Sequence, residues 1–262
     1  NRGFDQSASP GAKGSRRAMN PSLDIVVPVR NEESSIAAFY ARLERLGYAD
    51  HLIFVDNAST DRTRAIIDRF PTGRVIEHEV DEGYGASVRD GIAASNADFV
   101  VIIDADLEYP PEAIPELLDV LRHHSVVYCS RFLGGPPAMP LLRRFGNRLA
   151  TGLYNVLFGQ QITDFYTGMK GLRREALPFS TLRKGGFEHG AELGAMISLS
   201  GEKIQEVAVE YTPRSHGRSK MRHLRDGLKM TFYIVSYWVR CMILRRPLNP
   251  ETGASTGQRQ GR

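Results

Sequence analysis

The 262-residue sequence has few of the residues on which disulfide-stabilised or zinc-binding proteins depend. Its two cysteines, Cys129 and Cys241, form no CxxC pair, which argues against a disulfide framework and favours a reducing compartment. The seven histidines show no metal-ligand spacing. The chain also lacks GxGxxG and Walker motifs, so neither dinucleotide binding nor ATP hydrolysis is supported.

Long apolar runs are missing as well. The most hydrophobic segment, 224–244, is interrupted by Lys229 and Arg240, which leave 10 uncharged residues between them. Those residues make roughly 15 Å of helix, against about 30 Å for the hydrocarbon core of a bilayer. We therefore expect this helix either to lie in a membrane interface or to pack onto the domain.

The two ends of the sequence carry little that could build a core. Residues 1–22 are polar and small, with no secretory signal, and 249–262 are rich in Gly, Ser, Pro and Arg. We expect both segments to be disordered. The remainder is expected to form one domain over 23–220 and a C-terminal interfacial helix over 221–248.

The charge balance is mildly basic, with 34 Lys and Arg against 30 Asp and Glu and a net charge of +4. Such a balance favours an acidic small molecule or an anionic surface as partner. Nucleic acid is not expected, because no basic run is interleaved with aromatic residues.

Strand-like and helix-like segments alternate along the chain. Short branched apolar runs at 23–29, 51–55, 74–79 and 97–103 alternate with helical segments at 31–46, 62–69 and 83–94. This alternation predicts an α/β fold with a mostly parallel sheet covered by helices on both faces. Further helices are expected at 112–124, 139–158, 186–199 and 224–244, and further strands at 126–129, up to 172 and at 207–211.

Polar residues follow each of the first four predicted strands. Open α/β sheets bind ligands at the carboxyl ends of their strands, so these residues are expected to gather in one site. They are Arg30 and Glu32, Asp56 and Asp61, Asp81 and Gly85, and the Asp-Ala-Asp at 104–106.

Three carboxylates alternate after the fourth strand: Asp104, Asp106 and Glu108. On an extended segment, alternate side chains lie on one side, and clustered carboxylates repel one another unless a cation neutralises them. Hard oxygen ligands suit Mg²⁺ or Mn²⁺. The alternative is a solvated acidic turn before the helix that Pro110 and Pro111 introduce.

Three more segments each allow a functional and a plain structural interpretation. Gly83-Tyr84-Gly85 is either a weak phosphate loop or a tight turn. The basic amphipathic helix 139–158 lies at a membrane interface or holds a phosphate, or else it packs on the core with a solvated Arg face. The loop 213–220 is either a phosphate-binding loop or an ordinary exposed basic loop.

Three motifs together resemble glycosyltransferase family 2, and within it the polyprenol-phosphate sugar synthases of the dolichol-phosphate mannose synthase type. They are IVVPVRNE at 25–32, VDNASTD at 55–61 and DADLEYPPE at 104–112, and the resemblance extends over about 23–245. It implies a GT-A fold, a nucleotide-sugar donor, Mg²⁺ or Mn²⁺, and inversion at the anomeric carbon.

The site residues are expected to divide into sets. The donor set combines positions implied by the resemblance with strand-end residues: Pro28, Arg30, Glu32, Asp56, Asp81, Gly85, Asp104, Arg214 and Lys220. The resemblance implies metal ligation by Asp104, Asp106 and Glu108, and an acceptor-phosphate grip by Arg131, Arg143 and Asn147. The catalytic set is Asp106, Arg131, Asp164 and Glu192.

Several positions depart from the family pattern. Arg30 stands where Tyr is common, Asn57 where a second Asp is usual, and Tyr84 where Lys is frequent, which leaves the nucleotide base open. Glu108 replaces Gln, and Asn147 replaces Ser.

The expected reaction is transfer of a hexose, most simply mannose from GDP-mannose, to a polyprenyl phosphate on the cytoplasmic face of a membrane by a peripheral enzyme. Alternatives are UDP-glucose as donor, a soluble glycan as acceptor, a sugar nucleotidyltransferase, and a non-catalytic nucleotide- or membrane-binding module. A nucleotidyltransferase would carry a Gly-rich loop after the first strand, where Pro28-Val29-Arg30-Asn31 stands.

Overall fold

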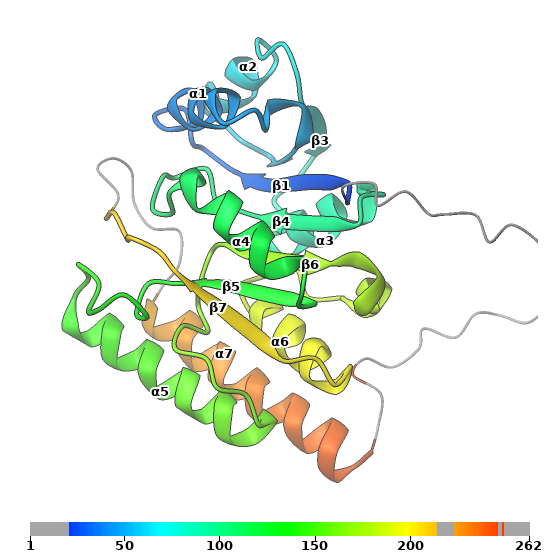
Figure 1. Cartoon of the computed structure of the whole chain (residues 1–262), viewed down its shortest axis with the longest axis vertical. Helices are drawn as coiled ribbons and strands as arrows, with labels where there is room; N and C mark the ends of the chain where they lie inside the picture. The colour runs from blue at the N-terminus through cyan, green and yellow to red at the C-terminus, as the bar shows by residue number, and fades with distance from the viewer. Residues whose placement is uncertain (1–20, 214–222, 246–247, 249–262) are drawn as a thin grey trace, which may run out of the picture.

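A computed structural model describes residues 21–213, 223–245 and 248, with the backbone alone for 223–226. Its centre is a seven-stranded sheet in the order β3-β2-β1-β4-β6-β5-β7 (Figure 1). The strands are β1 Leu23–Val29, β2 Leu52–Asn57, β3 Arg74–His78, β4 Phe99–Ile102, β5 Val126–Ser130, β6 Lys170–Arg173 and β7 Ile204–Ala208. β6 runs antiparallel to both of its neighbours, and the other pairs are parallel. The predicted α/β class with a mostly parallel sheet is confirmed.

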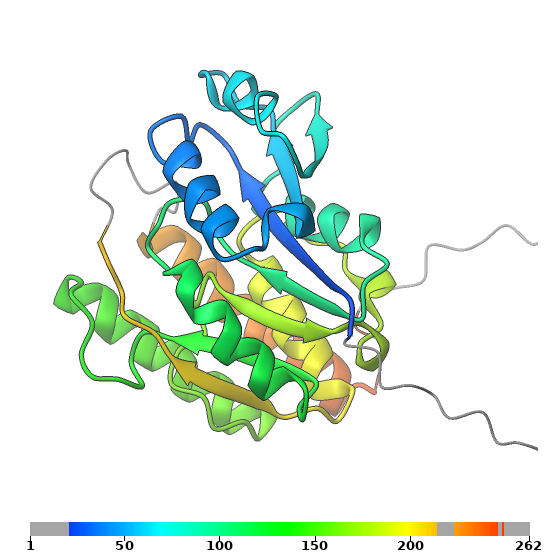
Figure 2. The same cartoon turned by 45° about the horizontal axis from the view of Figure 1, so that its top comes forward.

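Helices cover both faces of this sheet. They are α1 Ile36–Arg45, α2 Thr63–Ile67, α3 Tyr84–Ala94, α4 Ile114–Leu121, α5 Leu141–Phe158, α6 His189–Leu199 and α7 His223–Trp238. Short 3₁₀ turns lie at Ala49–His51, Pro111–Ala113, Arg174–Ala176 and Phe179–Thr181, and a π-helical turn, Val239–Ile243, continues α7. Figures 1 and 2 both place α1 and α2 at the β3 end of the sheet, with α5 and α7 at the opposite end.

The apolar alternation of β1 explains the two hydrophobic layers. Val26 packs into the cluster that α3, α5, α6 and α7 complete, whereas Ile25 and Val27 pack into the cluster of α1, α2 and α4. Because successive side chains of a strand point to opposite faces, a strand that is apolar throughout belongs in the middle of such a sandwich.

The strand order places the ligand-binding edge. From β1 the chain moves outward through β2 and β3, and it then returns to the other side of β1 with β4. This reversal between β1 and β4 is a topological switch point, where the carboxyl ends of neighbouring strands open a crevice. Arg30 comes directly after β1, and Asp104 lies two residues after the end of β4.

Three segments differ from their predicted bounds. Asn31 adopts a left-handed conformation, with φ at 52°, so the residues after β1 form a turn and α1 begins only at Ile36. β4 ends at Ile102, and Leu107 also has a positive φ, at 62°. The Asp104–Glu108 segment is therefore a turn, and the predicted extended backbone is wrong there. The last strand lies at Ile204–Ala208, earlier than the predicted 207–211.

Helix α7 packs onto the domain with one face, and its placement in a membrane interface stays a prediction. Met230, Ile234 and Tyr237 are buried against the domain, while Leu228 and Phe232 are exposed on the other face. In the part of the chain that the structure describes, no helix is both long and apolar enough to cross a membrane.

Candidate active site

A cavity of about 870 Å³ opens beside the carboxyl ends of β1 and β4. Ten residues singled out from the sequence line it: Pro28, Arg30, Glu32, Asp81, Asp104, Asp106, Glu108, Arg131, Arg143 and Asn147. Four others are not among its lining residues: Asp56, Gly85, Asp164 and Glu192. Arg214 and Lys220 lie outside the described residues.

At one end of the cavity, Asp81 accepts from the Gly83 backbone N–H at 3.1 Å and from two side chains. Arg30 forms an ion pair with it, and the Asn57 side-chain amide donates to its Oδ1 at 2.7 Å. The Asn57 side-chain oxygen, Oδ1, in turn accepts a hydrogen bond from the backbone N–H of Glu82 at 2.9 Å. An aspartate at position 57 would repel Asp81 and could not donate, so the departure from the family pattern has a structural reason here.

Two more acidic residues shape this end. Asp56 is buried and accepts a hydrogen bond from the Ser59 backbone N–H at 3.1 Å, which fixes the turn after β2 from behind the cavity wall. The Glu32 carboxylate lines the cavity and accepts the Ser35 hydroxyl at 3.0 Å. Both stay predictions as donor-binding residues.

The turn after β4 brings its three carboxylates to the cavity wall. The Asp106 Oδ1 accepts the backbone N–H of Glu108 at 3.0 Å and so stabilises the turn. Gly168 lies against Asp104, because a Cβ at this glycine would come within 2.5 Å of the Asp104 Oδ2. Burial, followed by the charge of Asp104, raises the pKa of Tyr84, which also lines the cavity.

The carboxylate set suits a hard divalent cation. Asp104, Asp106 and Glu108 line one wall of the cavity, but they are not drawn into a tight cluster of ligand atoms. Mg²⁺ commonly takes one or two carboxylates and completes its octahedron with water and substrate phosphates. A spread set of carboxylates facing an 870 Å³ cavity fits that mode of binding.

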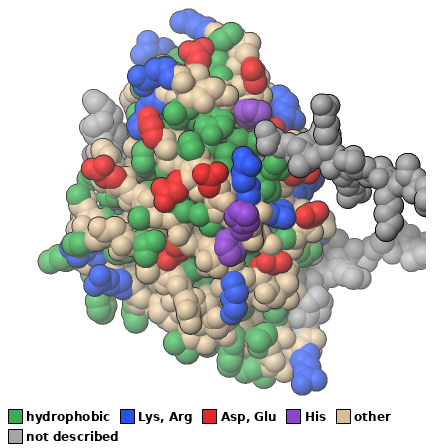
Figure 3. Space-filling view, viewed as in Figure 1, with side chains coloured by type: hydrophobic (Ala, Val, Ile, Leu, Met, Phe, Trp, Pro, Cys, Tyr) green, Lys and Arg blue, Asp and Glu red, His purple; other side chains and the backbone are tan. Residues whose placement is uncertain are grey.

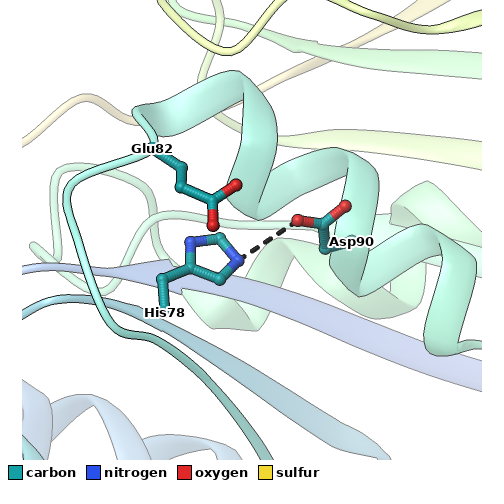
Figure 4. Close-up of side chains that lie close together, drawn as sticks. All are labelled: His78, Glu82 and Asp90. Atoms are coloured by element: carbon teal, nitrogen blue, oxygen red, sulfur yellow. Dashed lines mark ion pairs between the residues drawn. The ribbon is translucent and has the colours of Figure 1, made fainter.

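A second group, His78, Glu82 and Asp90, does bring its ligand atoms within 4.8 Å of one another (Figure 4). His78 Nε2 lies 3.2 Å from Asp90 Oδ2. Arg89 already supplies positive charge, since its Nε donates to Asp90 Oδ1 at 2.8 Å. We therefore interpret this group as an ion-pair network beside the cavity.

The other end of the cavity is built around a buried ion pair. Arg131 donates from Nε to Asp164 Oδ2 at 2.7 Å and from Nη2 to Oδ1 at 2.9 Å. The Asn147 amide donates to the same Oδ1 at 2.7 Å. The Asp164 side chain is fully buried, whereas that of Arg131 is 11% exposed and reaches the cavity.

The electrostatics of this pair keep both groups charged. Burial alone would raise the pKa of Asp164, but the Arg131 charge and the hydrogen bonds from Arg131 and Asn147 lower it below its ordinary value. Arg131 also lies 5.6 Å from the ring centroids of Tyr109 and Tyr211, a cation–π distance. Asp164 therefore orients Arg131 from behind the wall.

Glu192 holds a loop against α3. It accepts the backbone N–H groups of Arg183 at 2.9 Å and Lys184 at 2.9 Å. The next two residues of that loop pack against the glycine turn, where a Cβ on Gly83 would come within 2.5 Å of the Gly185 carbonyl oxygen. Ala86 N donates to that oxygen at 3.1 Å. The close approach favours the structural interpretation of the glycine turn, and the catalytic role of Glu192 stays a prediction.

Two buried side chains on the cavity wall were missed from the sequence. Burial lowers the pKa of Lys170 to about 8, and its ammonium group donates to the Thr167 carbonyl. Burial, followed by the charges of Lys170 and Arg89, lowers the pKa of His189 to about 3. Neither residue belongs to a recognisable sequence motif. Their burial at the cavity follows from the packed structure, in which Lys170 begins the antiparallel β6 and His189 begins α6.

The comparisons with known proteins decide the family. The sequence model of Glycosyl transferase family 2 matches residues 24–178, which contain both ends of the cavity. The chain belongs to this family. It is thus a glycosyltransferase, as its motifs predicted, and Asp104, Arg131 and Asp164 all lie inside the matched segment.

The curated proteins that this chain resembles include two whose names specify dolichyl or dolichol phosphate. The chain is 33% identical to the dolichyl-phosphate hexose transferase of Haloferax volcanii over 207 residues, which is 78% of this chain and 89% of that protein. It is 26% identical to the dolichol-phosphate mannosyltransferase of Pyrococcus furiosus over 211 residues, covering 76% of this chain but 59% of that protein.

A solved structure supports the GT-A expectation for the fold. The glucosyl-3-phosphoglycerate synthase of Mycobacterium tuberculosis, in complex with Mn²⁺, uridine diphosphate and phosphoglyceric acid, superposes with a TM-score of 0.62 at 23% identity. The match covers 84% of this chain and 78% of that chain.

Proposed function

We propose that this family 2 enzyme transfers a hexose from a nucleotide sugar to a polyprenyl phosphate at a membrane surface. The supporting observation is the reach of its cavity, which extends from Asp104 and Asp106 to Leu142, Phe145 and Leu149 on α5. Those three apolar side chains are 77%, 67% and 65% exposed. A sugar or small anion gains nothing from such a rim, whereas an isoprenoid chain gains by leaving water.

The donor end would take the nucleotide sugar. Pro28, Arg30 and Asp81 lie where the nucleoside is proposed to bind, with Arg214 and Lys220 proposed for the diphosphate. Asp104, Asp106 and Glu108 would hold Mg²⁺ or Mn²⁺, whose contribution is to neutralise charge on the leaving diphosphate. The relatives leave both GDP-mannose and UDP-glucose open, and we favour GDP-mannose.

The acceptor end would take the phosphate of the lipid. Arg131 is oriented by two hydrogen bonds to Asp164 and so presents its remaining donors to the cavity in a fixed direction. Arg143 is exposed on the first turn of α5 and lines the same cavity. Asn147 acts through Asp164, to which its amide donates. Guanidinium groups are good bidentate partners for phosphate.

The chemistry needs little beyond positioning. A phosphate oxygen of the lipid attacks the anomeric carbon while the bond from that carbon to the diphosphate oxygen breaks, which inverts the configuration. The phosphate is already anionic, so no general base has to activate it. The enzyme must bring two anions together, and a guanidinium pair opposite a carboxylate-bound cation lowers that cost.

The exposed faces of α5 and α7 would contact the membrane. Leu141 and Phe145 on α5, together with Leu228 and Phe232 on α7, are exposed, and Arg143, Arg144 and Arg148 flank the first pair. On the face seen in Figure 3, hydrophobic and basic side chains alternate along the edge that α5 occupies in Figure 1. We propose peripheral binding on the cytoplasmic face of a membrane.

A transfer screen tests this proposal directly. GDP-mannose, GDP-glucose and UDP-glucose are each offered with a short-chain polyprenyl phosphate or with 3-phosphoglycerate, in Mg²⁺, in Mn²⁺ or in EDTA. We expect a lipid-linked hexose from one donor, lost in EDTA. Transfer to 3-phosphoglycerate alone would overturn the lipid acceptor, and donor binding without transfer to any acceptor would favour a binding module.

A further inference from the structure

His189 is a buried polar side chain that the proposed mechanism does not use. It begins α6, is 2% exposed and lines the cavity. Neither of its ring nitrogens has a hydrogen-bond partner among the described residues. Buried polar groups in folded proteins are nearly always paired, so a ring with two unsatisfied nitrogens at a cavity wall calls for a ligand.

Other histidines of the chain show the ordinary arrangement. His51 Nδ1 is 2.9 Å from the Leu23 carbonyl oxygen, and His78 Nδ1 is 3.1 Å from the Asn57 side-chain oxygen. Neither residue lines the cavity. His189 is distinguished from both by facing the cavity without such a partner.

His189 lines the cavity beside the start of α3, where a Cβ on Gly85 would meet it. The segment 166–170 lines the same cavity and contacts both of its ends: the Tyr166 carbonyl accepts Arg131 Nη2 at 3.2 Å, and Gly168 lies against Asp104. The transferred sugar would lie between the leaving diphosphate and the acceptor phosphate, so its hydroxyl groups would face this wall.

The protonation state of His189 favours a hydroxyl over a phosphate. Burial and the nearby cations Lys170 and Arg89 keep the ring neutral, with its pKa lowered to about 3. A neutral imidazole offers one N–H donor and one acceptor nitrogen. A sugar hydroxyl can satisfy either, whereas a phosphate presents only acceptors to a ring that has one donor.

The packing of three helices fixes the position from which the His189 side chain projects. A Cβ on Gly85 would come within 2.4 Å of the His189 Cβ, so α3 and α6 approach each other closely at this point. Gly190, the next residue, packs against Met230 of α7, whose Cε would lie 3.3 Å from a Cβ there. A side chain that starts at this junction can select one hydroxyl position.

We infer that His189 hydrogen-bonds one hydroxyl of the transferred hexose and is a specificity-determining residue for the sugar. This inference rests on the proposed function, because it requires a nucleotide hexose in the cavity. A site built around a hydroxyl discriminates strongly against analogues that lack it, since the protein group is then left unpaired.

The test compares the preferred nucleotide hexose with its 2-, 3-, 4- and 6-deoxy analogues. For the wild type we expect one analogue to lose about tenfold or more in kcat/KM. In His189→Ala, we expect that one analogue to be used as well as the preferred hexose, with no change for the other three. His189→Asn should retain part of the discrimination. Affinity for the nucleoside diphosphate without sugar should stay unchanged in both variants, and His51→Ala serves as control.

Several outcomes would overturn the inference. One is a folded His189→Ala variant that discriminates against all four deoxy analogues as the wild type does. Another is a loss of affinity for the nucleoside diphosphate alone that is as large as the loss for the nucleotide hexose. If both His189 variants unfold at the assay temperature, the ring holds the fold instead. Donor hydrolysis that depends on His189 without any transfer to lipid would leave this inference standing and remove the proposed acceptor, whereas no binding of any nucleotide hexose removes both.

Discussion

The two ends of the cavity are built by different means. At the donor end, Arg30, Asp81 and Asp104 follow parallel strands or the loops between them, so the sheet itself brings them together. At the acceptor end, Arg131 follows the carboxyl end of β5, and Asp164 comes from the loop before the amino end of the antiparallel β6. Asn147 comes from α5. The first end depends on topology, and the second depends on a buried ion pair.

The largest expected effect is at the donor end. Asp106→Ala and Asp106→Asn should lower transfer by about 10²–10³-fold, because each removes a charge that faces the proposed cation. Asparagine keeps an oxygen that can accept the Glu108 N–H, so it preserves the turn. Turnover across a Mg²⁺ and Mn²⁺ titration measures the effect.

The exposed Asp119 on α4 provides the control, since Asp119→Asn changes the same group away from the cavity. Asp106→Asn should have the same melting temperature as the wild type, because it keeps the acceptor for the Glu108 N–H. Substantial metal-dependent turnover by Asp106→Asn would show that this carboxylate is not a ligand.

At the acceptor end, two arginines should respond differently. Arg131→Ala and Arg143→Ala are each expected to raise the KM for polyprenyl phosphate by about ten- to a hundredfold, since a charged hydrogen bond contributes roughly 1.5–3 kcal/mol. Only Arg131→Ala should also destabilise the fold, by about 3–5 kcal/mol, because it leaves the Asp164 carboxylate buried and unpaired.

A double variant separates the two roles of Arg131. Adding Asp164→Asn to Arg131→Ala removes the unpaired charge, so it should restore part of the stability in urea denaturation without restoring use of the acceptor. Equal stability losses in Arg131→Ala and Arg143→Ala would contradict the contrast between the buried and the exposed arginine.

Membrane binding should respond to apolar side chains that lie off the cavity wall. Leu141 and Phe232 are exposed and are not among the cavity-lining residues. The Leu141→Ser, Phe232→Ser double variant should weaken binding to anionic liposomes by about tenfold, from roughly 1.5 kcal/mol or more of lost apolar burial. Liposome co-sedimentation measures this, and donor hydrolysis should be spared.

Val75→Ser, on β3 at the far end of the sheet, is the matched control and should bind liposomes as the wild type does. Added salt should weaken wild-type binding only in part, because apolar insertion is not screened. No binding of the wild type to any liposome would remove the membrane from the proposal.

The smallest effect is the contribution of the acceptor-end ion pair to the pH dependence of stability. The folded-state pKa of Asp164 is lowered below its ordinary value of 3.8. The ion pair therefore stabilises the protein fully above that pH, and the contribution is lost as the pH falls through the folded-state pKa. Denaturant unfolding between pH 5 and 2.5 should show a steeper loss for wild type than for Asp164→Asn. Parallel slopes would mean that this carboxylate titrates normally.

Physical reasoning from the sequence explains why the donor-end residues gather, but not how the residues of the acceptor end pair. Strand–helix alternation is a local pattern, and parallel strands bring their carboxyl ends to one edge, so Asp104 and Arg30 could be placed together. The pairing of Arg131 with Asp164 depends on the antiparallel β6, which no local pattern announces. His189 and Lys170 were missed because burial next to a cavity is a property of the packed chain.

Local backbone geometry limited the predictions as well. The alternation of Asp104, Asp106 and Glu108 predicts an extended segment, but Leu107 has a positive φ and the segment turns. Asp104 and Asp106 reach the cavity nonetheless, because a turn at the end of a central strand still projects its side chains over the switch point.

The reversed direction of β6 joins the two ends of the cavity through one loop. Because β6 begins at the edge where β4 and β5 end, the loop that precedes it, 159–169, carries Asp164 to Arg131 at the acceptor end and Gly168 to Asp104 at the donor end. Exchanging that loop together with α5 between family members would therefore change the contact to Asp104 along with the acceptor end. In evolutionary terms, the fold couples a change of one substrate to the site of the other.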